Sequence, residues 1–151
     1  MTQALVNAGN PAFLAYGITC VVLSLNLLML WIFSGATRAR SGVAINPEDG
    51  ARYGASVADL DPPAVARFLR AHRNAEATIY PFLLLGLVFV LAGGAARVAV
   101  PIFSLFVLAR IAHSVVYLRA LQPWRTIAFA TSLLATVALT VALARVLLAA
   151  A

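Results

Sequence analysis

Four long apolar stretches dominate the pattern of the chain, and its polar residues gather between and at the ends of them. The first stretch, residues 13–33, has no charged side chain over 21 positions, and about 20 apolar residues suffice to cross a bilayer. Because lipid offers no hydrogen-bond partners, each crossing must be helical. The pattern predicts an all-α integral membrane protein, with one domain over residues 1–151 and spans at about 12–36, 63–92, 97–119 and 124–149.

Composition supports this class. Of the 151 residues, 63% are hydrophobic and 11% are charged, whereas soluble domains lie near one half and one quarter respectively. The net charge of +6 comes with no lysine at all, and the arginines alternate with the predicted spans. This arrangement fits membrane orientation and anion binding better than a nucleic-acid partner, which is not expected. No metal site is expected either.

The arginines are also distributed unequally between the two ends of the predicted spans. Most lie in or beside the connections between spans 1 and 2 and between spans 3 and 4. By the positive-inside rule these connections are cytoplasmic, and both termini lie on the opposite side. In a bacterium the protein would occupy the inner membrane with periplasmic termini.

The most unusual stretch is residues 67–82, where a strongly polar segment runs directly into an apolar one. At about 100° per residue, its polar side chains fall on two neighbouring stripes of a helix. The third predicted span carries further polar residues on one face, and two more open the fourth span. The positions concerned are Arg70, Arg73, Asn74, Glu76 and Tyr80, then Arg110, His113 and Tyr117, then Arg125 and Thr126.

Arg110 lies well inside a predicted span. A charge at that depth costs about 2.5–3.5 kcal/mol on insertion scales, so the guanidinium must face protein or water. Glu76 is the only carboxylate within a predicted span, and we expect the two to pair, within one chain or between chains. Any single arginine could simply anchor lipid headgroups. The set, however, favours a small ligand with more than one carboxylate, because guanidinium groups bind carboxylates in a bidentate manner.

Five motifs carry a resemblance to a known family: NPED at 46–49, RAHRN at 70–74, TIYPF at 78–82, RIAHS at 110–114 followed by Tyr117-Leu118, and QPWRT at 122–126. Through them, and over almost the whole chain, the sequence resembles the membrane-associated proteins in eicosanoid and glutathione metabolism. It is most similar to the branch of microsomal prostaglandin E synthase and microsomal glutathione transferase. The resemblance implies a homotrimer of four-helix subunits, embedded in membrane lipids, with glutathione bound between subunits near the cytoplasmic face.

The resemblance also implies residue roles. Arg125 would lie at the glutathione thiol and favour the thiolate, and the Thr126 hydroxyl could hydrogen-bond the sulfur. Asp49 matches a loop carboxylate proposed as a proton acceptor in the isomerase reaction, although a turn or cap role in the NPED loop explains it equally well. The implied glutathione-binding residues are Arg38, Arg70, His72, Arg73, Asn74, Glu76, His113 and Tyr117.

Two positions depart from the family pattern. The family usually has glutamate three residues after the asparagine of the RAHRN motif, but here Glu76 comes two residues after it and Ala77 takes the usual place. This rotates the carboxylate by about 100°. Either the helix is locally rewound, or Glu76 reaches Arg73 or Arg110 without the usual contact with glutathione. Phe129 stands where the prostaglandin synthase branch can have tyrosine, which removes a hydroxyl.

Three functions follow from these observations. The leading one is a glutathione transferase or peroxidase that acts on lipophilic electrophiles or hydroperoxides arriving from the bilayer. The alternatives are an endoperoxide isomerase of the prostaglandin E synthase type and a non-catalytic lipid-binding or scaffold member of the family. The presence of Arg125 together with Arg73, Asn74 and Tyr117 favours an enzyme. A transporter fits less well, because the charges gather at one level of the membrane.

Overall fold

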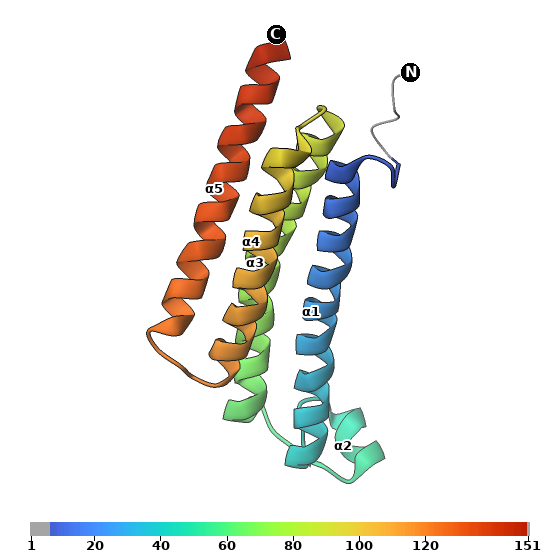
Figure 1. The fold of residues 1–151 in the computed structure, drawn as a ribbon. Helices are drawn as coiled ribbons and strands as arrows, with labels where there is room; N and C mark the ends of the chain where they lie inside the picture. Colours follow the sequence, from blue (N-terminus) through green and yellow to red (C-terminus); the bar gives the residue numbers. More distant parts are fainter. Residues whose placement is uncertain (1–6, 151) are drawn as a thin grey trace.

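Four long helices make up most of the computed structural model, which describes residues 7–150 (Figure 1). They are α1 (Pro11–Ser41), α3 (Pro63–Leu91), α4 (Ala96–Leu118) and α5 (Trp124–Ala150). Each is long and apolar enough to cross a membrane. The start of α1 and the end of α5 lie at one end of the bundle, and the α4–α5 connection lies at the other. Over these residues, the predicted all-α bundle of four membrane helices is confirmed.

α1 is longer than expected. Asn10 caps its start by accepting a hydrogen bond from the backbone N–H of Ala12, at 3.0 Å. Arg38 and Arg40, which were expected to follow the span, lie in its last helical turn. The helix ends only at Gly42, whose φ of 64° is a left-handed conformation that glycine adopts readily. The other three long helices begin and end within one residue of the expected bounds.

The connection between α1 and α3 is more ordered than the polar loop that the sequence suggested. It contains the short helix α2 (Pro47–Tyr53) and two parallel strands of two residues each, β1 (Val43–Ala44) and β2 (Ser56–Val57). Gly50 makes this packing possible, because a Cβ at that position would collide with the Val57 side chain. The connection therefore forms a small cap against the end of α1 (Figure 1).

Aromatic rings form the centre of the bundle. The rings of Phe82 in α3 and Phe106 in α4 stack with centroids 3.6 Å apart and planes 3° apart. Phe103 meets Phe82 edge-on at 5.7 Å and lies 6.1 Å from Tyr16 of α1. All three phenylalanines are buried. Helices in lipid associate through close packing rather than through exclusion of water, so this cluster is expected to hold α1, α3 and α4 together.

Gly86 lets α1 approach α3 closely, and its replacement by valine should loosen this contact. A Cβ on Gly86 would lie 3.3 Å from both the Phe103 ring and the Tyr16 ring. We expect Gly86→Val to lower the free energy of unfolding by about 1–3 kcal/mol, as overpacking does elsewhere. Gly17→Val is the matched control, because no atom lies within 4 Å of its added Cβ. Equal losses from the two variants in detergent unfolding would contradict the packing role of Gly86.

Candidate functional site

A cavity of about 330 Å³ opens where α3, α4 and the start of α5 meet. We call it the α5 cavity. Its polar lining consists of amide, imidazole, phenol, guanidinium and hydroxyl groups, and the lining includes no carboxylate. The six residues are Asn74 from α3, His113 and Tyr117 from α4, and Arg125, Thr126 and Phe129 from α5. Five of these were expected at the site, and Phe129 was noted as a departure from the family pattern.

Gln122 holds the two residues that open α5. With its amide oxygen toward Arg125, Gln122 accepts hydrogen bonds from Nε at 3.2 Å and from Nη2 at 2.7 Å. Its amide nitrogen then donates to the Thr126 hydroxyl oxygen at 3.1 Å. In this orientation the threonine oxygen is the acceptor of the pair, so the hydroxyl group can donate to a ligand. This role of Gln122 was not recognised from the sequence, although its spacing of three and four residues from Arg125 and Thr126 is that of helical neighbours.

Aromatic rings orient the remaining side chains of the cavity. The Arg125 guanidinium carbon lies 5.0 Å from the centroid of the Tyr117 ring, within the range of a cation–π contact. The His113 ring is 5.5 Å from that of Tyr117 and 6.1 Å from that of Phe129. His113 itself is almost fully buried. The Arg125 guanidinium is therefore held on two sides, by the Gln122 amide and by the Tyr117 ring.

Arg110 lies behind the α5 cavity and is fully buried, with 0% exposure. Its Nη2 donates to Oδ1 of Asn74 at 3.1 Å. Nε and Nη1 of the same guanidinium have no hydrogen-bond partner among the described residues. Because the Asn74 oxygen is engaged with Arg110, the amide nitrogen of Asn74 is the group left to donate to a ligand.

Glu76 does not pair with Arg110 within the chain, and that form of the predicted pairing is wrong. Its carboxylate lies 3.3 Å from Nδ1 of His72 and accepts a hydrogen bond from the Tyr80 hydroxyl, also at 3.3 Å. The reason is helical geometry, since a residue two positions after Asn74 is rotated by about 200° from it. Both partners of Glu76 lie four residues away on α3 instead. A pairing between chains stays a prediction.

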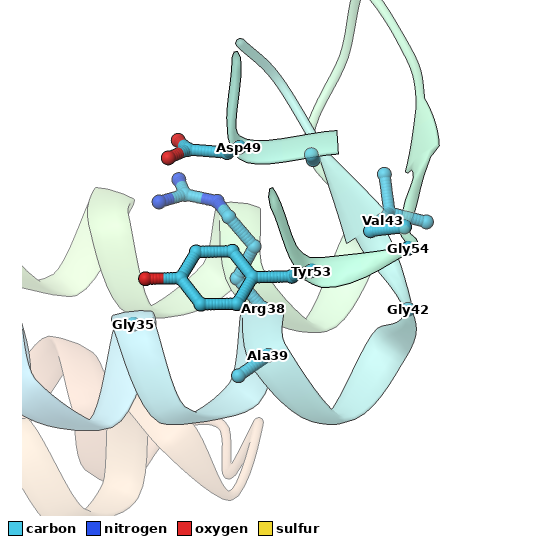
Figure 2. Close-up of a pocket in the computed structure, with 10 residues that line it drawn as sticks. Gly35, Arg38, Ala39, Gly42, Val43, Asp49, Tyr53 and Gly54 are labelled. Carbon is cyan, nitrogen blue, oxygen red and sulfur yellow. The ribbon is translucent and has the colours of Figure 1, made fainter. Parts of the chain in front are cut away.

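A second cavity, of about 380 Å³, lies between the end of α1 and the cap formed by α2, β1 and β2. We call it the α2 cavity. Figure 2 shows the Arg38 guanidinium beneath the Asp49 carboxylate, with the Tyr53 ring beside it. Arg38 donates from Nε to Oδ1 of Asp61 at 2.8 Å. Asp49 accepts a hydrogen bond from the Asn46 amide at 3.1 Å, so it also takes part in the turn that the NPED motif suggested.

The single chain thus divides the expected site residues between the two cavities and other positions on α3. Five line the α5 cavity, and Arg38 and Asp49 line the α2 cavity. Arg70 and Arg73 are exposed on α3 and line neither cavity. Nδ1 of His72 lies 3.3 Å from the Glu76 carboxylate, and the His72 ring lies 5.7 Å from that of Trp31 in α1.

Comparison with known proteins identifies the family of this chain. The model of the MAPEG family matches residues 16–145. The chain is 38% identical to human prostaglandin E synthase over 121 residues, which is 80% of each chain. It is 40% identical to the horse prostaglandin E synthase over 120 residues, which is 79% of this chain and 76% of the relative. It is 37% identical to bovine microsomal glutathione S-transferase 1 over 134 residues, which is 85% of this chain and 84% of the relative. The chain therefore belongs to the MAPEG family of integral membrane proteins.

Proposed function

We propose that this protein is a glutathione-dependent membrane enzyme that acts on lipophilic electrophiles or hydroperoxides, in the manner of a glutathione transferase or peroxidase. The observation that carries the proposal is the α5 cavity, in which an oriented guanidinium, a hydroxyl and an amide line one space. Such a donor set suits an anionic sulfur and carboxylates. The similarity to a microsomal glutathione S-transferase supports the choice of thiol.

The residues of the cavity have distinct roles in this proposal. Bound glutathione supplies a sulfur nucleophile, which reacts as the thiolate. Arg125 places a positive charge beside the sulfur and so favours the deprotonated form. Thr126 donates its hydroxyl proton to the same sulfur, while Asn74 donates its amide N–H to a carboxylate or peptide oxygen of the tripeptide. His113 and Tyr117 line the remaining polar part of the α5 cavity.

We also propose that the working unit is a homotrimer with its sites between subunits. In one chain, Arg38 and Asp49 line the α2 cavity, apart from Arg125. An assembly that places the α2 cavity of one copy beside the α5 cavity of the next would unite the two sets. It would bring a further guanidinium and a carboxylate to the ligand, in the roles that the family resemblance implies for Arg38 and Asp49.

A second candidate is isomerisation of a lipid endoperoxide. Several relatives named prostaglandin E synthase, with identities of 35–40%, favour it. The isomerase reaction needs a group to accept a proton from the substrate, and Asp49 is the candidate. An Asp49→Asn variant that keeps conjugation of an aryl halide but loses endoperoxide isomerisation would favour this second function.

The test of the proposal is the ultraviolet thiolate absorbance that appears when glutathione is added to the purified protein. We expect a thiolate signal and turnover of an aryl halide or a lipid hydroperoxide in the wild type. Arg125→Ala should reduce both by roughly tenfold or more, because a lost guanidinium raises a thiol pKa by about one unit. Arg145→Ala, which removes an exposed arginine near the far end of the same helix, is the matched control. Wild-type protein with neither signal nor turnover would refute the proposal.

A further inference from the structure

Backbone hydrogen bonds fix the residues on either side of Gln122, in the connection between α4 and α5. The N–H of Leu121 donates to the carbonyl of Val116 at 3.0 Å. The carbonyl of Pro123 accepts a hydrogen bond from the N–H of Thr126 at 2.9 Å. The Gln122 side chain therefore projects from a turn that is anchored to α4 before it and to α5 after it.

Arg125 determines which way the Gln122 amide faces. A guanidinium has only N–H donors, so the amide oxygen must be the atom that faces it. That oxygen accepts from Nε at 3.2 Å and from Nη2 at 2.7 Å, and the amide nitrogen then donates to the Thr126 hydroxyl oxygen at 3.1 Å. One amide thus engages one edge of the guanidinium, and Nη1 of Arg125 and the Thr126 hydroxyl can donate to the ligand.

The neutral amide differs in two ways from other side chains of similar length. A carboxylate could accept the same two hydrogen bonds, but it would add a negative charge beside the guanidinium and could not donate to Thr126. An apolar side chain would make neither contact. The amide orients Arg125 and leaves its full positive charge to act on a neighbouring sulfur. Resting on the proposed function, we propose that Gln122 is a positioning residue that raises the thiolate fraction of bound glutathione by orienting Arg125 and Thr126.

The test follows the thiolate absorbance of glutathione bound to the full-length protein in lipid nanodiscs as the pH is varied. Gln122→Met keeps the length of the side chain and removes both contacts. We expect it to raise the apparent pKa of the bound thiol by about 0.5, which is a roughly threefold loss of thiolate below that pKa. Gln122→Glu keeps the contact with Arg125 but adds a negative charge, and we expect a rise of about 1, which is a roughly tenfold loss.

Arg119→Gln is the matched control for charge. It makes the connection between α4 and α5 more negative by one unit, as Gln122→Glu does, but Arg119 is exposed and lies outside the α5 cavity. We expect it to shift the thiol pKa by less than about 0.2. Equal shifts from Arg119→Gln and Gln122→Glu would show that only the net charge of the connection matters, which overturns the inference.

Two further measurements separate positioning from a general loss of structure. S-methylglutathione has no ionisable thiol, so its dissociation constant reports binding of the tripeptide alone. We expect this constant to stay within roughly twofold of the wild-type value in both Gln122 variants. In the Arg125→Ala background, Gln122→Met should shift the thiol pKa by less than about half of its shift in the wild type, because Gln122 acts through Arg125.

The outcomes distinguish the inference from the proposed function. A wild-type thiolate signal that Gln122→Met leaves unchanged overturns the inference and leaves the proposed function intact. Loss of S-methylglutathione binding in the Gln122 variants, or a full shift in the Arg125→Ala background, also overturns the inference alone. If glutathione gives no thiolate signal with the wild type, the proposed function fails and the inference fails with it.

Discussion

Replacing Phe82 with alanine is expected to lower the free energy of unfolding by about 2–3 kcal/mol. The Phe82 ring is fully buried and touches rings from the neighbouring helix on two sides. Its removal leaves a space of about 100 Å³, and packed cores lose about 24 cal/mol per Å³ of cavity. The larger losses known from water-soluble proteins do not apply, because the unfolded helices stay in an apolar medium and no transfer to water is involved.

Equilibrium unfolding in mixed micelles, followed by circular dichroism and by the fluorescence of Trp31 and Trp124, measures this loss. Leu84→Ala is the matched control, since Leu84 lies two residues further along α3 and is 66% exposed. We expect the control to change stability by less than about 0.5 kcal/mol. A loss from Phe82→Ala as small as that of the control would mean that the ring stack does not hold α3 against α4.

The membrane helices were predictable because the bilayer leaves few choices. An apolar run of sufficient length must be helical, and the expected bounds of α3, α4 and α5 lie within one residue of the observed ones. The end of α1 was not marked in this way. Arg38 and Arg40 limit the apolar part of the helix, but backbone hydrogen bonds continue until Gly42 turns the chain. The α2 cap was also missed, because a seven-residue helix between turn residues carries too little periodicity.

The site was predictable where residues share a helix and less so where they meet across helices. The spacing of His113 and Tyr117 placed both in the α5 cavity, as expected from one face of α4. The same wheel argument, applied strictly, would have turned Glu76 away from Asn74 and toward its i±4 neighbours. The contact between Arg110 and Asn74 depends on how far α4 is shifted along α3, and no pattern within either helix specifies that register.

The position of Arg110 has an energetic consequence. A guanidinium does not lose its proton under ordinary conditions, so it remains charged even when it is fully buried. Among the described residues, the Asn74 oxygen is its one hydrogen-bond acceptor. The stability of this part of the bundle should therefore depend on the asparagine more than on the arginine, although the arginine is the larger and charged partner.

Asn74→Ala should accordingly cost about 2–3 kcal/mol, since it leaves a buried charge without a partner. Arg110→Met should cost less than about 1 kcal/mol or stabilise the protein, because it removes the charge and keeps much of the volume. In the double variant the alanine should add little, which corresponds to a coupling of about 2 kcal/mol between the two positions. The same unfolding experiment in micelles measures the wild type, the two single variants and the double variant. Additive losses, or a loss from Arg110→Met as large as that from Asn74→Ala, would show instead that the guanidinium itself stabilises the bundle.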